Sequence, residues 1–277
     1  MVINNNIMDD EKAGKEVKDN NSVSAEEEKQ TVELPAFDFF KINFLSFLVP
    51  LYVCLGLFLL FEYCFIIPFS IPLIIHLLIL PGFFLFLYYV YLIILIEFTA
   101  FWTRKWNKKS PPVQGVFKRV LDDVNSEEGT MIKYYHKRGF IIKYPMWLTA
   151  KSPFPWLINR TLRRIGHNKI GKNVIYCDSY VGLEFTDLGD NVFIYPTSGL
   201  ATHAVNTIFG KISILELKLG KNTTLYPGII AGPGVLTTKN NVIFPNTVLH
   251  KNWRGKPGKL YYQGSPGKPI PKSRKNL

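Results

Sequence analysis

The chain has 277 residues, of which 47% are hydrophobic and 14% aromatic but only 19% charged, and its formal net charge is +12. A soluble domain of this size usually has about a quarter of its residues charged. Between residues 42 and 102 the only charged side chains are Glu62 and Glu97. A membrane-spanning helix takes roughly 20 apolar residues, so a run of this length excludes a purely cytosolic protein.

Residues 1–38 come before this run and are rich in Asn, Glu, Lys and Ser. They offer too little apolar surface for a packed core, which is typical of disordered segments. Residues 1–41 contain ten acidic side chains and five lysines. We therefore predict a disordered acidic tail over residues 1–38. We do not expect a signal peptide, because the basic start and the small-residue cleavage site are both missing.

Residues 39–104 are predicted to form a transmembrane helical hairpin. Glu62, Pro68, Ser70 and Pro72 cluster near the middle of the apolar run, which predicts helices over about 42–65 and 71–102. Two spans place both ends of the hairpin on the same side of the membrane. Basic residues follow the second helix directly and predict that this side is cytoplasmic: Arg104, Lys105, Lys108 and Lys109. We expect an integral membrane protein with both termini in the cytoplasm.

Residues 105–160 are predicted to be a basic, aromatic segment next to the membrane. The chain from residue 103 onward has 28 basic and nine acidic side chains. Basic residues mixed with aromatics occur in nucleic-acid interfaces and also on surfaces that lie on anionic lipid headgroups. The neighbouring spans favour membrane lipid as the partner, and we expect no nucleic acid. Residues 156–165 (WLINRTLRRI) predict a short basic amphipathic helix.

A six-residue period begins near residue 165. Apolar or small residues recur at this spacing in two blocks: Ile170, Tyr176, Gly182, Leu188, Ile194 and Leu200, then Leu219, Leu225, Ala231, Thr237, Ile243 and Leu249. The fifth position of the hexads is small or branched, and the corners contain Gly, Asn, Asp or Pro. Residues 201–218 interrupt the period and form an inserted loop.

A period of six predicts short parallel strands separated by tight corners, with three strands in each coil of 18 residues. The first residue of each hexad points inward and stacks on its equivalent in the next coil. The predicted fold is thus a transmembrane helix pair plus a left-handed parallel β-helix of about four coils. The β-helix covers residues 161–277, including a C-terminal basic tail. The alternative is a β-sandwich with coincidental spacing.

The end of the sequence carries a resemblance to a known family. The stretch Tyr262-Gln-Gly-Ser-Pro-Gly-Lys-Pro-Ile270 resembles the Gly-Asn-Pro-Ala-Lys-Pro-Ile signature that closes hexapeptide-repeat acyltransferases, with Ser265 and Gly267 in place of Asn and Ala. Residues 162–206 are similar to the membrane-embedded β-helix domains of poly-amino-acid synthetases such as polylysine synthetase. The shared stretches are Leu-Arg-Arg-Ile-Gly, Val-Ile-Tyr-Cys-Asp-Ser, Leu-Gly-Asp-Asn-Val and Ala-Thr-His.

The resemblance implies a membrane-anchored acyltransferase. It would move an acyl group, with acetyl as the first expectation, from acyl-CoA to a hydroxyl or amine of a small-molecule, lipid-linked or polymeric acceptor. A histidine acts as the general base in that family, and His203 at the start of the inserted loop is the candidate. The alternative is a His203 that only forms hydrogen bonds within the loop or across a subunit interface.

The resemblance also implies that acyl-CoA lies along the β-helix between neighbouring subunits. Gly232 and Gly234 would let its pantetheine arm approach the chain closely. Its phosphates would be met by Lys251, Arg254 and Lys268. The alternative is a basic tail that faces solvent or lipid. We expect no metal, because no two histidines are five residues apart, as a zinc site of the related γ-class carbonic anhydrases requires.

We expect a homotrimer, because four coils bury a thin core and leave flat outer faces that a neighbour can cover. The inserted loop is too apolar to lie in water, so we expect it to pack on a neighbouring subunit, with packing on its own coils as the alternative. A different function remains open at this point. The chain could be a non-catalytic trimeric membrane scaffold or conduit built from the β-helix and the helix pairs.

Overall fold

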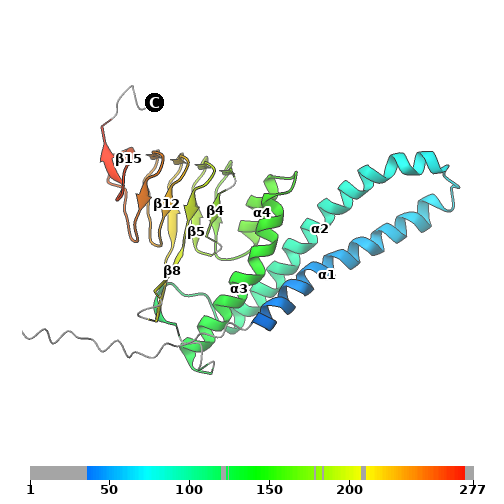
Figure 1. Cartoon of the computed structure of the whole chain (residues 1–277), viewed down its shortest axis with the longest axis horizontal. Helices are drawn as coiled ribbons and strands as arrows, with labels where there is room; N and C mark the ends of the chain where they lie inside the picture. The colour runs from blue at the N-terminus through cyan, green and yellow to red at the C-terminus, as the bar shows by residue number, and fades with distance from the viewer. Residues whose placement is uncertain are drawn as a thin grey trace, which may run out of the picture. The chain divides into compact units, whose positions relative to one another are not determined.

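The computed structural model describes residues 36–271, except for 120–122, 124, 178, 183 and 207–209. Most of the predicted acidic tail and the last residues of the predicted basic tail lie outside the described residues. The described chain starts with a helical hairpin, continues through two further helices and ends in a stack of short strands (Figure 1).

The hairpin consists of α1 (Ala36–Phe61), a π-helical turn (Glu62–Ile66) and α2 (Leu73–Lys109). The predicted break between Glu62 and Pro72 is therefore confirmed, although α1 begins earlier and α2 ends later than predicted. By length and composition both helices could cross a membrane, with mean hydropathies of 2.5 and 2.4. Only 17% and 22% of their most apolar stretches are buried, whereas the core helix of a soluble protein is mostly buried.

Two more helices, α3 (Glu127–Ala150) and α4 (Trp156–Arg164), pack on the second half of α2. α4 confirms the predicted amphipathic helix. α3 falls in the segment that the sequence indicated only as basic and aromatic. Its first turn has Ser126 as the N-cap, whose Oγ accepts a hydrogen bond of 3.1 Å from the N–H of Gly129. The two glutamates that follow Ser126 suit the positive end of the helix dipole.

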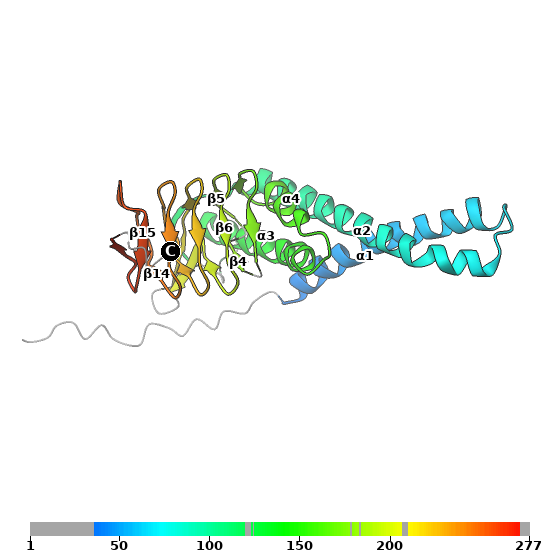
Figure 2. The same cartoon turned by 90° about the horizontal axis from the view of Figure 1, so that it is seen from above.

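Residues 169–263 coil through three parallel sheets in rotation (Figure 2). The first sheet contains β2 (Lys169–Ile170), β5 (Thr186–Leu188) and β10 (Leu217–Leu219). The second contains β3 (Ile175–Tyr176), β6 (Phe193–Ile194), β11 (Thr224–Leu225), β13 (Val242–Ile243), β15 (Tyr261–Gln263) and the antiparallel β16 (Lys268–Ile270). The third contains β4 (Tyr180–Val181), β7 (Gly199–Leu200), β12 (Ile230–Ala231) and β14 (Val248–Leu249).

This rotation confirms a three-sided parallel coil with about four turns in the described chain, while its left-handed sense stays a prediction. Isolated bridges through Leu236 and Arg254 continue the first sheet in the later coils. The predicted inward stack is present, since Leu188, Ile194, Leu200 and their equivalents in the later coils are buried. One asparagine per coil has a positive φ at the same corner, where the side-chain amides form a ladder from Asn173 through Asn191 and Asn222 to Asn240.

The first coil departs from the predicted phase at one position. The six-residue spacing places Gly182 in the inward stack, but Val181 occupies that place and pairs with Leu200. Gly182 lies against Thr202 instead, where an added Cβ would be 2.7 Å from the threonine side chain. Val181 is thus one residue early, and the coil returns to the six-residue phase at Leu188, which pairs with Ile170.

The inserted loop leaves the coil after β7 as an antiparallel ribbon. β8 (His203–Asn206) pairs with β9 (Lys211–Ile214), which pairs with β1 (Gly115–Lys118) on its other edge. Ile212 and Ile214 are buried against Ile132 of α3. These two isoleucines are thus covered by α3 of the same chain and need neither a neighbouring subunit nor the coils, whereas Val205 of β8 stays 42% exposed. Residues 207–209, part of the same expectation, lie outside the described residues.

Candidate functional site

His203 is the first residue of β8, at the corner where the chain leaves the third sheet. Residues directly opposite each other in an antiparallel pair place their side chains on the same face. His203 is paired with Ile214, so these two side chains share one face of the ribbon, and Val205 joins them two residues further on. This face is directed towards α3, where the Tyr135 ring meets the His203 ring edge-on at 6.0 Å between centroids.

A cavity of about 270 Å³ lies between α3 and the ribbon. α3 contributes one wall, and the ribbon together with the first corner of the coil contributes the other. The lining residues are Tyr135, His136, Gly139, Phe140, Lys143, Tyr180, Glu184, Thr202, His203, Val205 and Ile214. Most of the lining surface is apolar. Four lining side chains are charged or can exchange a proton near neutral pH: the imidazoles of His136 and His203, the ammonium of Lys143 and the carboxylate of Glu184.

Both histidines of this cavity are held in the neutral form. Burial lowers the pKa of His203, and the nearby Lys143 ammonium lowers it further. Burial also lowers the pKa of His136, to about 4, with added repulsion from Arg119, His203 and Lys143. The buried Nε2 of His136 has no hydrogen-bond partner among the described residues. At neutral pH each imidazole therefore has a nitrogen lone pair that can accept a proton or a hydrogen bond.

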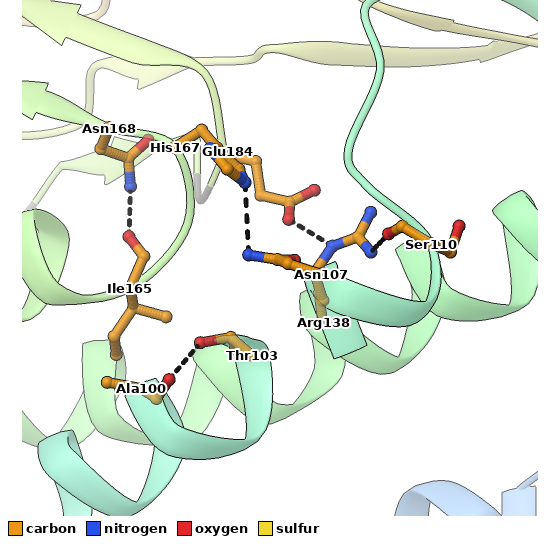
Figure 3. A network of polar contacts seen from close by, with 9 residues as sticks. All are labelled: Ala100, Thr103, Asn107, Ser110, Arg138, Ile165, His167, Asn168 and Glu184. Carbon is orange, nitrogen blue, oxygen red and sulfur yellow. Dashed lines mark hydrogen bonds and ion pairs between the residues drawn. The ribbon is translucent and has the colours of Figure 1, made fainter. Parts of the chain in front are cut away.

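Glu184 supplies the buried carboxylate. Its Oε1 accepts a hydrogen bond of 2.7 Å from Nε of Arg138, and Arg138 also donates from Nη1 to the carbonyl of Ser110 at 3.0 Å (Figure 3). The other oxygen, Oε2, is buried without a partner in the described part of the chain. Burial and the Glu184 charge both raise the pKa of Tyr135. An unpaired buried carboxylate oxygen is costly, so a donor on a bound molecule would be favourable there.

The predicted donor-binding residues are spread over several parts of the coil. Gly232 and Gly234 form the corner one coil after His203, and Gly234 has a φ of +80°. Nζ of Lys251, in the following corner, donates a hydrogen bond of 2.6 Å to Oγ of Ser213. Ser213 is paired with Ala204 and so lies on the face of the ribbon opposite to His203.

Arg254 and Lys268 are exposed and lie elsewhere, the first at a bridge of the first sheet and the second on β16. The structure thus brings Lys251 and the two glycines to the column of corners that holds His203, but not into its cavity. His167, at the start of the coil, forms a 3.3 Å hydrogen bond with Asn107 (Figure 3) and stacks on Phe185.

Sequence reasoning missed one wall of the cavity because it missed α3. Ser126 followed by Glu127 and Glu128 is a signal for the start of a helix and could have located it. The positions of His136 and Lys143 would then have placed them two turns apart on one helix. No sequence signal connects that helix to the corner at Glu184, because the contact joins segments that are 46 residues apart.

No family model matches this sequence, and no curated protein matches it. Among solved structures the chain is similar to a maltose O-acetyltransferase from Clostridium difficile 630, with 20% identity over 50% of this chain and 87% of that one and a TM-score of 0.41. It is also similar to a galactoside acetyltransferase in complex with coenzyme A, with 16% identity over 50% of this chain and 81% of that one and a TM-score of 0.39. A third similar structure is a hexapeptide-repeat acetyltransferase from Vibrio cholerae complexed with acetyl-coenzyme A. The identity is 12% over 54% of this chain and 91% of that one, and the TM-score is 0.37.

Proposed function

We propose that the chain is a membrane-anchored acyltransferase that moves an acyl group from acyl-CoA to a hydroxyl or amine, with His203 as the general base. The observation that carries the proposal is a neutral, half-buried His203 that faces a cavity of about 270 Å³. A general base must be unprotonated at the working pH and must have room for the group whose proton it takes. The resemblance to hexapeptide-repeat acyltransferases gives acyl-CoA as the donor.

In this proposal His203 accepts the proton of the acceptor hydroxyl or amine while that oxygen or nitrogen attacks the thioester carbonyl carbon. The carbon–sulfur bond then breaks, and the protonated imidazole returns its proton to the departing sulfur. The acyl group ends on the acceptor, the donor leaves as the free thiol, and His203 is neutral again. The Lys143 charge disfavours a protonated resting state and so keeps His203 ready to accept a proton.

Glu184 completes the acceptor side of the cavity. Its unpaired Oε2 accepts a hydrogen bond from a second hydroxyl or amine of the acceptor and so orients the reacting group towards His203. Arg138 fixes this carboxylate from the opposite side through the 2.7 Å contact. A carboxylate held in this way loses little freedom when the acceptor binds.

The hairpin supports the membrane part of the proposal. Large apolar side chains are exposed along both helices of the hairpin, which is costly in water and favourable in lipid. Basic side chains at the end of α2 favour the cytoplasmic side for the β-helix and both termini. The acceptor would then be reached at the membrane surface. Among the possible acceptors, the similarity to poly-amino-acid synthetases favours a polymeric one.

The experiment uses the full chain purified in detergent. Acetyl-CoA binding is measured by calorimetry, and release of the free thiol is followed with a panel of amine and hydroxyl acceptors. We expect His203→Ala to lower the transfer rate by about 10²–10⁴ while acetyl-CoA binding is retained. His167→Ala is the matched control and should keep most of the activity, because His167 lies outside the cavity lining. The absence of any acetyl-CoA binding to the parent protein would overturn the proposal.

One observation favours the alternative, a non-catalytic trimeric scaffold. Lys251 is bound by Ser213 on the face of the ribbon opposite to His203, so the predicted donor-binding cation and the predicted base do not face one space. A scaffold predicts no acetyl-CoA binding and the same oligomeric state in the parent and in His203→Ala. The binding measurement therefore separates the two functions.

A further inference from the structure

We propose that the α1–α2 hairpin enters the membrane from one side and ends inside it, with its turn among the lipid acyl chains. The sequence alone suggested two complete spans. Three features of the structure favour an insertion that returns to the same side: the length of the hairpin that is free of other helices, the chemistry of the residues around its base, and the composition of its turn.

The free length of the hairpin is short. Sγ of Cys54 contacts the carbonyl oxygen of Leu87 at 3.5 Å, so these two residues lie at the same level. At this level Phe154, which precedes α4, packs on the rings of Tyr88 and Tyr89 with centroid distances of 6.0 and 5.0 Å. Beyond it 12 residues remain on the α1 side when the π-helical turn is included, and 14 residues of α2 precede Leu87. At about 1.5 Å per residue they reach roughly 20 Å, which is less than the 30 Å hydrocarbon core.

The base of the hairpin is suited to the headgroup region. Trp147 and Trp156 are 60% and 58% exposed near this level, and tryptophan side chains are enriched at the membrane interface. Arg160 and Arg164 of α4 form ion pairs with Glu97 of α2. Charged side chains of this kind are costly in hydrocarbon, so α4 has to stay at or above the headgroups. In Figures 1 and 2 the turn of the hairpin extends well beyond α3 and α4.

The turn itself is apolar. Tyr63, Ile67, Phe69 and Leu73 are 66% to 73% exposed, and no charged side chain occurs between Glu62 and His76. A turn that emerged into water on the far side would expose this surface at a high free-energy cost, whereas acyl chains solvate it.

Several polar groups near the turn pair within the hairpin. Oε1 of Glu62 and Nε2 of His76 are 2.9 Å apart, so each pairs with the other. Backbone hydrogen bonds run from Ile67 to Glu62, from Ser70 to Ile67 and from Ile71 to Ile66. Backbone polar groups inside a bilayer have to be paired within the protein, and these bonds pair three N–H groups of the turn. The partner that fits this surface is therefore the hydrocarbon of the lipid.

The test is labelling of single cysteines with a membrane-impermeant maleimide in sealed membranes of both orientations. Cys64 and Cys177 are replaced by serine, and the buried Cys54 remains as a common background. One variant adds Phe69→Cys in the turn. The control adds Lys239→Cys at an exposed corner of the β-helix. We expect Phe69→Cys to react from neither side and to react once detergent is added, while Lys239→Cys reacts from one side without detergent.

Three results would overturn the proposal. Reaction of Phe69→Cys from the side opposite to Lys239→Cys would show a complete span. Reaction from the same side would show a hairpin that is not inserted, and no reaction even in detergent would show that protein covers the turn. A second pair of variants checks the depth. Phe69→Lys should lower the carbonate-resistant membrane fraction several-fold relative to Phe69→Leu, and equal fractions would contradict a turn in the hydrocarbon.

Discussion

Arg138 of α3 and Glu184 of the first coil form an ion pair of 2.7 Å that is almost completely buried, with 1% and 5% of the two side chains exposed. The pair joins the helices to the coil, and Glu184, whose second carboxylate oxygen has no partner among the described residues, also lines the candidate cavity. A pair of this kind contributes to the position of a group more than to net stability, because desolvation offsets much of the attraction.

Removal of one partner of this pair should be strongly destabilising. Arg138→Met leaves Glu184 charged and buried without a partner, and such changes typically cost about 3–5 kcal/mol. Chemical unfolding of the detergent-solubilised protein measures the loss. The control is Lys218→Met, which removes an ion pair with Asp187 at 2.9 Å whose lysine is 52% exposed. That change should cost at most about 1 kcal/mol. Similar losses in the two variants would show that the buried pair does not hold the helices to the coil.

The phase of the repeat can be tested by charge. Ile194 lies in the inward stack with none of its surface exposed, so Ile194→Asp buries an unpaired carboxylate and should cost several kcal/mol. Lys239→Asp changes an exposed corner and should alter the midpoint of thermal unfolding by little. Circular dichroism melts compare the two. A loss in Lys239→Asp as large as that in Ile194→Asp would contradict the assigned phase.

Stability should depend on pH through the two histidines of the cavity. Folding lowers the pKa of His136 from its ordinary value of 6.5 to about 4 and also lowers the pKa of His203. Between these values the unfolded chain binds more protons than the folded chain. The free energy of unfolding should therefore be highest above pH 6.5 and should fall as the pH drops towards 4.

Unfolding experiments at several pH values measure this dependence. His136→Gln should make the curve clearly flatter, because a neutral side chain replaces the group with the largest shift. His250→Gln is the control, since His250 is exposed. If the parent and His136→Gln show the same slope, the lowered pKa of His136 does not contribute to stability.

A trimer is expected from the outer surface of the second sheet. Four aromatic side chains follow one another along it, the first three stacked and the last pair tilted, with centroids 5.2 to 6.2 Å apart: Tyr195, Tyr226, Phe244 and Tyr261. Aromatic side chains are enriched in the cores of subunit interfaces. Mass photometry in detergent should give three copies, and Tyr226→Lys should shift the population towards single copies. A monomeric parent protein with an intact β-helix would contradict this expectation.

The sequence determined the three-sided coil and the hairpin because both have local signals, a six-residue period in one and a long apolar run with a break in the other. The stack that contains Leu188, Ile194 and Leu200 recurs every six residues, and a buried position repeated at a fixed spacing leaves few other folds. The break near Pro72 and the apolar runs on either side specify the two helices in the same way. His203 could be singled out because it starts the segment that interrupts the period.

Only the tertiary structure decided what surrounds His203. The cavity forms where α3 packs on an antiparallel ribbon, and its groups come from segments that are far apart in the chain: His136, Glu184 and His203. The alternation of side chains along the ribbon places Lys251 on its other face, which spacing in the sequence does not reveal. The physical reason is that a repeat fixes contacts between equivalent positions of neighbouring coils. A site between a helix and an insertion depends instead on how two unrelated surfaces pack, and that packing has no period to read.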